Sequence, residues 1–231
     1  MTGQAIRMMT WNVHGTFNLN PRFDVRPIVA LIEKWKPDVV ALQEVDSRGR
    51  PENPFSMLEE AIGGHSVHAH SIVTEDGNYG QTLISRWPWL SEPKILDLSF
   101  RKREPRRAIG AELRGPFGGL HVMATHLGLS LRERREQSRS LLEFATGSIY
   151  PTIVMGDFND WFWVGSVRRV LADHFPVRTR RRTFPGVWPM MKLDRIYAAR
   201  SMRLIGDFVD PAAIRVSDHL PVMADFALKD E

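Results

Sequence analysis

Helical periodicity and short apolar runs alternate along the chain. Over residues 24–35 the apolar side chains recur every three or four positions, the spacing that places them on one face of a helix. They are Val25, Ile28, Val29, Ile32 and Trp35. A second helix is predicted over residues 131–145, with an apolar face in its second half and charged residues through most of its first half. We expect that charged half to face either solvent or a ligand.

The apolar runs predict strands, because they are too short for helices. They fall at residues 5–12, 39–43, 81–85, 107–113, 120–125, 152–155, 192–198 and 221–228. No long polar linker divides the chain, so we expect a single domain over residues 1–231. Many strands with interspersed helices predict an α/β or α+β fold in which two sheets pack face to face.

The composition is typical of a globular protein with a large core. Of the 231 residues, 43% are hydrophobic, and charges of both signs are mixed along the chain. There is no cysteine, which excludes thiolate zinc sites and thiol nucleophiles. The first predicted strand leaves no room for a signal peptide, and no apolar run reaches the ~20 residues that span a membrane. We therefore expect a cytoplasmic monomer without a transmembrane segment.

Much of the positive charge is concentrated in two short segments. The formal net charge is +4. The clusters are Arg101, Lys102, Arg103, Arg106 and Arg107, and Arg178, Arg180, Arg181 and Arg182. Such clustering favours an anionic partner such as phosphate, nucleic acid or a lipid headgroup. The alternative is that both segments are solvated loops.

Polar residues suited to metal and phosphate chemistry stand at the ends of the predicted strands. They are Asn12, Glu44, His126, Asp157, Asn159, Asp194, Asp218 and His219. A strand end presents a side chain from a rigid scaffold, so we expect these residues to face a shared cleft. Asp157 and Asn159 lie two positions apart, and in extended backbone their side chains point the same way. Each residue alone is an ordinary surface or core residue, and only their joint occurrence indicates a site.

These residue types favour metal-assisted hydrolysis of a phosphate ester. Carboxylate and amide oxygens without cysteine favour a hard cation, so Mg²⁺ or Mn²⁺ is expected rather than zinc. A histidine beside a carboxylate can accept a proton or stabilise a transition state. There is no Gly-x-Ser-x-Gly elbow and no Walker loop, so water is the expected nucleophile.

The motifs around these residues resemble those of the endonuclease/exonuclease/phosphatase superfamily, which includes DNase I. In chain order they are Trp-Asn-Val-His-Gly, Leu-Gln-Glu-Val, Ile-Ser-Arg-Trp-Pro, Ala-Thr-His-Leu, Gly-Asp-Phe-Asn-Asp, Leu-Asp-Arg-Ile-Tyr and Ser-Asp-His-Leu-Pro-Val. They span residues 11–222, nearly the whole chain. The resemblance implies a four-layer α/β/β/α sandwich of the DNase I-like type, with the site at one edge of the two sheets.

The same resemblance implies how the site binds its metal and its substrate. Glu44 corresponds to the principal metal ligand, with Asn12 and Asp218 close to the metal or its waters. The candidate phosphate-binding residues are Asn12, Asn159, Arg107 and Arg182.

The resemblance also implies the catalytic residues. His219 resembles the catalytic histidine, which would act as a base or stabilise the pentacovalent phosphorus, and Asp194 would orient it. Asp157 would position or deprotonate the attacking water. His126 is similar to the second histidine of the DNase I and sphingomyelinase branches, which the abasic-site endonucleases lack.

A narrower resemblance is to a bacterial YbhP-like branch. It rests on His-Leu-Gly-Leu at 126–129 with Arg134 and Gln137 after it, and on the segments 160–161 and 182–185. Two aromatic segments, 160–163 and 184–188, flank the predicted site in the chain. Exposed aromatic side chains there would stack on bases or insert among lipid chains, and the alternative is a hydrophobic cluster beneath the loop.

The leading hypothesis is a Mg²⁺-dependent phosphodiesterase or nuclease. The first alternative is hydrolysis of a phospholipid, a phosphoinositide or another small phosphoester. A remote alternative is a binding protein that has kept the fold without catalysis. Here every motif position is filled, which disfavours that last alternative.

Overall fold

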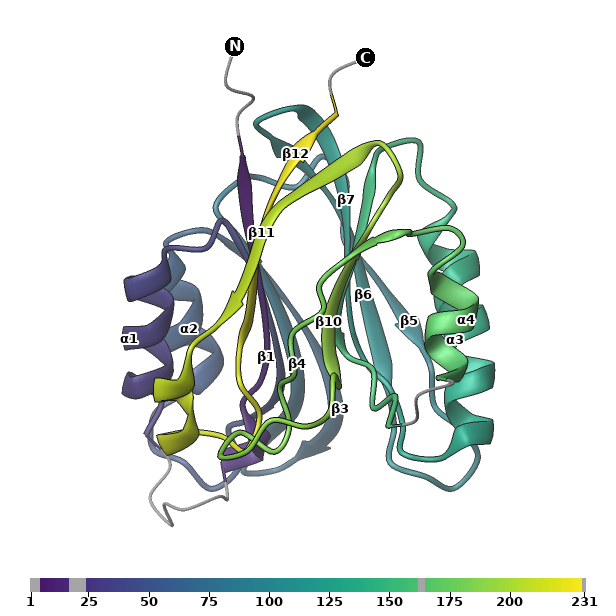
Figure 1. Cartoon of the computed structure of the whole chain (residues 1–231). Coiled ribbons are helices and arrows are strands. Elements are labelled where there is room, and N and C mark those ends of the chain that lie inside the picture. The colour runs from purple at the N-terminus through teal and green to yellow at the C-terminus, as the bar shows by residue number, and fades with distance from the viewer. Residues whose placement is uncertain (1–4, 17–23, 162–164, 230–231) are drawn as a thin grey trace.

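Two six-stranded sheets pack face to face and helices cover both outer faces (Figure 1). The computed structural model describes residues 5–16, 24–161 and 165–229. The predicted four-layer α/β/β/α sandwich is confirmed. The chain starts and finishes at one end of the sheets, and β1 runs from there to the opposite end (Figure 1).

The first sheet combines the two ends of the chain. Its strands in spatial order are β11 (Met202–Val209), β12 (Val222–Leu228), β1 (Ile6–Asn12), β2 (Val39–Asp46), β4 (Gly77–Ser85) and β3 (His65–Thr74). β1 and β2 are parallel, and the other neighbours in this sheet are antiparallel. Helix α1 (Arg26–Trp35) connects the parallel pair, as the helical periodicity predicts.

The second sheet is built from the middle of the chain. Its strands in spatial order are β5 (Lys94–Asp97), β6 (Arg107–Gly115), β7 (Gly118–His126), β8 (Thr152–Asp157), β10 (Asp194–Ala198) and β9 (Val177–Arg178). β7 and β8 are parallel, and helix α3 (Leu131–Ala145) connects them with the predicted bounds. Ser130 caps α3, because its hydroxyl accepts a hydrogen bond from the Glu133 backbone N–H.

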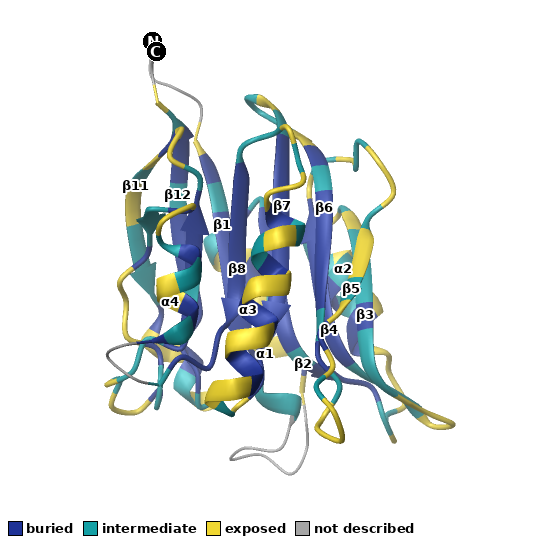
Figure 2. Ribbon diagram, turned by 90° about the vertical axis from the view of Figure 1, so that its right-hand side faces the viewer, coloured by how far each residue is buried: buried dark blue, intermediate teal, exposed yellow. Residues whose placement is uncertain are grey.

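The remaining helices are short. They are α2 (Pro54–Ile62), α4 (Ser166–Leu171) and the 3₁₀ helices η1 (His14–Thr16) and η2 (Pro211–Arg215). Helices α1 and α2 cover the outer face of the first sheet, and α3 and α4 cover the second (Figure 1). In α3 a buried stripe faces the sheet and an exposed stripe faces solvent (Figure 2).

The charged first half of α3 is neither solvated as a whole nor directed at a ligand, which corrects the sequence-based expectation. Glu133, Arg134 and Gln137 are buried. The guanidinium of Arg134 donates to the backbone carbonyls of Gly128 and Leu129. These carbonyl oxygens offset part of the cost of burying the cation, whose Nε has no hydrogen bond in the described residues.

The main core fills the space between the two sheets. Side chains from both sheets contribute to it, among them Met8, Ala41, Leu83, Ile109, Val122, Ala124, Ile153 and Ile196. The strands are apolar on both faces because helices cover their outer sides, which explains the continuous apolar runs in the sequence. The core therefore fixes how the strand ends of one sheet lie relative to those of the other.

Candidate active site

The predicted site residues meet at the edge of the sheets where β1, β7 and β8 end. In the strand register His126 lies opposite Asp157, and Asp157 lies opposite Asp194. Asn12 reaches them from the first sheet. The structure therefore brings these side chains together at one edge of the sheets, where they are buried.

His219 is held in place from several directions. Its Nδ1 lies 2.8 Å from Asp194 Oδ2, the hydrogen bond expected from the sequence. Its backbone carbonyl accepts a hydrogen bond from the Trp11 indole at 2.9 Å. The Ser217 hydroxyl accepts from the His219 N–H at 3.0 Å and donates to the Asn12 carbonyl at 2.7 Å. The other ring nitrogen, Nε2, points to Asp157, 4.0 Å from its Oδ2.

The charges of His219 and Asp157 depend on each other. Burial opposes the charged form of His219, but the charge and hydrogen bond of Asp194, with help from Asp157, raise its pKa to about 10. Burial, then the charge of Asp194, raises the pKa of Asp157 to about 6 against the lowering effect of His219. At neutral pH the pair is therefore an imidazolium beside a carboxylate.

Asn12 links the two sheets across the cleft. Its Nδ2 donates to Glu44 Oε1 at 2.9 Å and to Asp157 Oδ2 at 3.0 Å. Its Oδ1 accepts from the His14 N–H at 2.8 Å, so the amide orientation is fixed. A single side chain thus sets the distance between the carboxylates of the two sheets.

Several backbone conformations in the cleft are ones that side chains rarely adopt. His14, Glu44 and Asn159 have φ of 56°, 59° and 49°. Glu44 stands at an irregularity in β2, where the pairing with β4 shifts register and the side chain turns to the cleft. Gly156 has φ 149°, and a Cβ there would lie 1.9 Å from the Thr125 carbonyl oxygen, so only glycine fits. Strained positions of this kind cluster at functional sites.

His126 is buried and bound to an arginine instead of a carboxylate. Arg106, which is also buried, donates from a guanidinium nitrogen to His126 Nδ1 at 2.9 Å. Burial, then the positive charge of Arg106, lowers the pKa of His126 well below its ordinary value. The ring is neutral with Nδ1 as acceptor, so its proton is on Nε2, which lies 3.6 Å from Asp157 Oδ2.

Arg107, the neighbour of Arg106, has protein partners of its own. It donates to the His70 carbonyl at 3.0 Å and lies 3.5 Å from an Asp97 oxygen. The first basic cluster is therefore divided. Arg106 belongs to the site, and Arg101 and Lys102 are exposed. The phosphate-binding role of Arg107 stays a prediction.

Gln137 and Arg134 support the loop that follows His126. Gln137 accepts from the Gly128 N–H and donates to the Leu98 carbonyl, both at 2.8 Å. Asn159 adds a hydrogen bond to the Leu127 carbonyl at 2.9 Å. These bonds give a physical reason for the residues shared with the YbhP-like branch, because they hold the backbone next to His126.

A second set of carboxylates lies on the open side of Glu44. A cavity of about 310 Å³ is lined there by Glu44, Asp46, Glu104 and His14. Asp218 contacts His14, with its Oδ1 3.0 Å from His14 Nδ1. The Asp218 hydrogen bond, with a weaker contribution from the nearby Glu44 charge, raises the pKa of His14.

Two groups of described residues are candidates for a divalent cation. Asp157, Asp194 and His219 each place a ligand atom within 4.8 Å of the others, and this group is buried, with a raised pKa at His219. Glu44 is 20% exposed and lines the open cavity with His14, which contacts Asp218. Hard cations bind carboxylate oxygens and keep waters, so these open carboxylates are the second candidate.

The rings of Trp161 and Phe184 form an aromatic ladder that ends on the ring of His219. The rings of Trp161 and Phe184 lie 5.4 Å apart, edge to face, and Phe184 lies 4.8 Å from the His219 ring. Val187 and Trp188 are more than 70% exposed. Part of the first aromatic segment, Phe162 and Trp163, lies outside the described residues. The segments therefore contain both a cluster over the site and an exposed apolar tip.

The sequence reasoning missed three residues that the structure places in the site. Arg106 binds His126, His14 faces Asp218, and Ser217 links His219 to β1. His14 and Ser217 stand inside the quoted motifs, so the motif context was the available signal. Nothing in the sequence distinguishes Arg106 from Arg107. In the described part of the chain no helix is long and apolar enough to cross a membrane.

The fold and this cleft define the class of protein. The model of the Endonuclease/Exonuclease/phosphatase family matches residues 9–219, and the chain belongs to this family. Similar proteins include the Escherichia coli (strain K12) protein named Uncharacterized protein YbhP, 27% identical over 97% of both chains. Exodeoxyribonuclease III of Haemophilus influenzae is 28% identical over 62% of this chain and 56% of its own. The predicted family and the YbhP-like resemblance are confirmed.

Solved structures share the fold at lower sequence identity. An endonuclease/exonuclease/phosphatase from Beutenbergia cavernae superposes with a TM-score of 0.80 at 22% identity, covering 97% of this chain and 72% of that one. D. rerio TDP2 complexed with single strand DNA product superposes with a TM-score of 0.75 at 19% identity, covering 96% and 98%.

Proposed function

We propose that this protein hydrolyses phosphodiesters by attack of a water molecule, with Mg²⁺ or Mn²⁺ as its cofactor. The observation that carries the proposal is the His219–Asp194 pair, whose free nitrogen faces Asp157 in a cleft that Asn12 shares with Glu44. This arrangement places a proton donor, a proton acceptor and an anionic metal ligand around one space. A phosphate diester is the group that needs all three.

Glu44 and Asp218 would hold the cation, with Asn12 close to its waters. Their oxygens are hard ligands, and the partly exposed position of Glu44 at the open cavity supports this assignment. When bound, the cation would withdraw negative charge from a phosphate oxygen.

His219 and Asp157 would divide the proton chemistry. Asp157 would accept a proton from the attacking water, because it is a carboxylate above about pH 6. His219 keeps its proton up to about pH 10, so its Nε2 would donate a hydrogen bond to the negative phosphate oxygens. Of the two roles that the family resemblance leaves open for His219, the structure supports the stabilising one.

The substrate phosphate would receive further hydrogen bonds from neutral donors. His126 would donate from Nε2, since Arg106 occupies its other nitrogen. Asn159 lies next to it, with Nδ2 3.3 Å from His126 Nε2. Arg107 and Arg182 are the cationic candidates for binding the substrate. Neither would bind the metal or transfer a proton.

Nucleic acid is the substrate class that we place first. The positive charge supports it, as do the relatives whose names are exodeoxyribonuclease III and TDP2 complexed with single strand DNA product. The exposed tip at Val187 and Trp188 favours the second candidate, a phospholipid, because such side chains insert among lipid chains.

A substrate panel tests the proposal. Plasmid, single-stranded DNA, RNA, bis-p-nitrophenyl phosphate and phospholipid vesicles are incubated with Mg²⁺, with Mn²⁺ and with EDTA. We expect cleavage of at least one phosphodiester that EDTA abolishes and that the His219→Ala variant loses by ~10²-fold or more. The exposed Asp173→Asn is the matched control and keeps its activity. Equal rates for wild type and His219→Ala, or no hydrolysis of any phosphodiester, would refute the proposal.

A further inference from the structure

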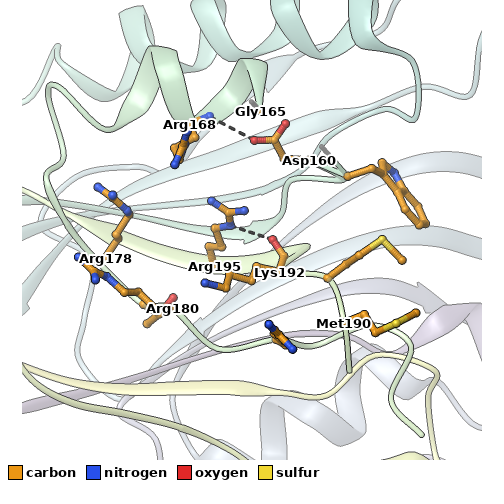
Figure 3. Close-up of a pocket in the computed structure, with 12 residues that line it drawn as sticks. Asp160, Gly165, Arg168, Arg178, Arg180, Met190, Lys192 and Arg195 are labelled. Carbon is orange, nitrogen blue, oxygen red and sulfur yellow. Dashed lines mark hydrogen bonds between the residues drawn. The ribbon is translucent and has the colours of Figure 1, made fainter. Parts of the chain in front are cut away.

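A basic cavity lies beside the active site and takes no part in the chemistry described above. Its volume is about 390 Å³, and it is enclosed by β9, β10, the start of α4 and the segments before and after Phe184. Six cationic side chains line it, those of Arg168, Arg178, Arg180, Arg182, Lys192 and Arg195. The labelled ones gather around the same space in Figure 3.

Part of the positive charge of this cavity is left without an ion-pair partner among the described residues. Among the residues the structure describes, no carboxylate lies within ion-pair distance of the side chains of Arg178, Arg180 or Arg182. Asp160 is the single acid among the described residues that line the cavity, and it accepts a hydrogen bond from a backbone N–H of α4 at 3.3 Å. By contrast Arg181 turns away to Asp207 at 2.9 Å. The second basic cluster is thus divided between a paired residue and three that face the cavity.

One of the cations, Arg195, is also fixed in position. Arg195 donates to the Lys192 carbonyl at 2.8 Å and to the Tyr197 hydroxyl at 3.2 Å, so its guanidinium is held at the cavity wall. Burial, then the charges of Arg195 and the other arginines, lowers the pKa of Lys192. Holding like charges together costs free energy, and a bound anion would remove that cost.

Short stretches of chain connect the lining of the cavity to the candidate active site. Asp160 follows Asn159 directly, and Arg195 follows Asp194. Trp161 lines the cavity and contacts Phe184, which contacts His219. A ligand that extends over this aromatic ladder would reach from the cleft into the cavity.

We propose that the basic cavity is a second anion site, which binds a phosphate group that is not cleaved. Resting on the proposed function, this means that the preferred substrate carries at least two phosphates, one at His219 and one among Arg178, Arg180 and Lys192. Guanidinium groups bind phosphate through paired, charge-assisted hydrogen bonds. The Trp161–Phe184 pair separates the two sites and offers a surface on which the part between the phosphates can stack.

The first experiment measures binding apart from catalysis. Pyrophosphate is titrated into the protein in EDTA by calorimetry, in the His219→Ala background, so that the catalytic cleft contributes little. We expect binding that the double variant Arg178→Gln/Arg180→Gln weakens tenfold or more. The matched control is Arg135→Gln/Arg139→Gln, on the exposed face of α3. Both doubles replace side chains outside the core, so circular dichroism and thermal unfolding should be unchanged. Equal pyrophosphate affinity in the cavity variant and the control would overturn the cavity site.

The second experiment measures selectivity. The kcat/KM is compared for a p-nitrophenyl ester of a mononucleotide, with one phosphate, and for that of a dinucleotide, with two. We expect the two-phosphate substrate to be preferred, and the preference to fall at least tenfold in the cavity variant but not in the control. An unchanged preference would overturn the role in substrate choice. If wild type hydrolyses neither ester, nucleic acid fails as the substrate class of the proposed function, while pyrophosphate binding still decides on the cavity site.

Competition identifies the source of the second phosphate. A 5′-phosphorylated dinucleotide and an inositol bisphosphate are each added as inhibitors. Stronger inhibition by the dinucleotide, lost in the cavity variant, assigns the site to nucleic acid, and the opposite order assigns it to a phosphorylated headgroup. No effect of the variant on either inhibition constant would overturn the proposal.

Discussion

The Asp194→Asn substitution tests the proton chemistry most directly. The pKa of His219 is about 10, against 6.5 for an unperturbed imidazole. At about 1.4 kcal/mol for each factor of ten, its surroundings favour the imidazolium by about 5 kcal/mol. Asp194 makes the largest favourable contribution, and the asparagine keeps the shape of the side chain while removing its charge. Burial then opposes the charge on His219 with less compensation, so its pKa should fall toward 6.5.

The expected result is a change in the pH dependence of kcat. In wild type, kcat rises as Asp157 loses its proton near pH 6 and falls as His219 loses its own near pH 10. In Asp194→Asn both limbs should move to lower pH, because the charge of Asp194 raises both pKa values. At pH 8 a histidine with a pKa near 6.5 is only about 3% protonated, so kcat should fall by about 30-fold.

The assay is kcat over about pH 5–11 with saturating substrate and Mg²⁺, together with NMR titration of the His219 ring. The control is Asp173→Asn, an exposed residue outside the site, whose profile should match wild type. An alkaline limb that stays near pH 10 in folded Asp194→Asn would show that Asp194 does not hold the proton on His219. The stabilising role of the imidazolium would then be abandoned.

Three further perturbations follow from the site. Glu44→Gln should abolish activity at ordinary Mg²⁺ concentrations. The melting temperature should be kept, because the amide oxygen still accepts a hydrogen bond from Asn12. Activity of this variant that persists in EDTA would exclude the metal mechanism. Gln137→Leu leaves two buried backbone groups without partners and should cost about 1–3 kcal/mol in urea unfolding, whereas the exposed Ser140→Ala should cost little. For an oligonucleotide substrate, a plot of log KM against log salt concentration should have a slope of about 0.7–0.9 per phosphate contact. Replacing Arg180, Arg181 and Arg182 by Glu should raise this KM more than the KM of bis-p-nitrophenyl phosphate. A KM that does not change with salt would exclude nucleic acid as the substrate.

The fold was predictable where burial is complete. Strands such as β8 and β12 are apolar because both faces are covered, so a continuous run in the sequence shows them. β3 and β11 were missed because they lie at sheet edges, where mixed exposure leaves no clear alternation. Helix α2 was missed although Asn53 and Pro54 mark its start, with Asn53 accepting from the Phe55 N–H at 3.0 Å.

The residues of the candidate site were predictable as a group, but the contacts between their side chains were not. Strand ends indicate which side chains share a cleft, since register and strand direction follow from local patterns. The contact of Arg106 with His126 depends on how β6 enters the sheet, which places one of two adjacent arginines inside. The burial of Arg134 was not predicted for a related reason. Its partners are backbone carbonyls, and a sequence does not show which carbonyls are free to accept a hydrogen bond.

The strand orders of the two sheets have a consequence for how the site is built. Read outward from the parallel pairs, β1–β2 and β7–β8, both sheets have the same sequence of parallel and antiparallel neighbours. The two halves of the molecule therefore share one strand arrangement. Asn12 and His126 end the matching strands β1 and β7, and Glu44 and Asp157 belong to the matching strands β2 and β8.

Under the proposed function, neither half holds the chemistry alone. The first sheet would contribute the anion that binds the cation, and the second would contribute the acceptor for the proton. Their separation is set by the side chains between the sheets, including the small residues Ala41 and Ala124. The packing between the halves therefore fixes the distance between these two groups.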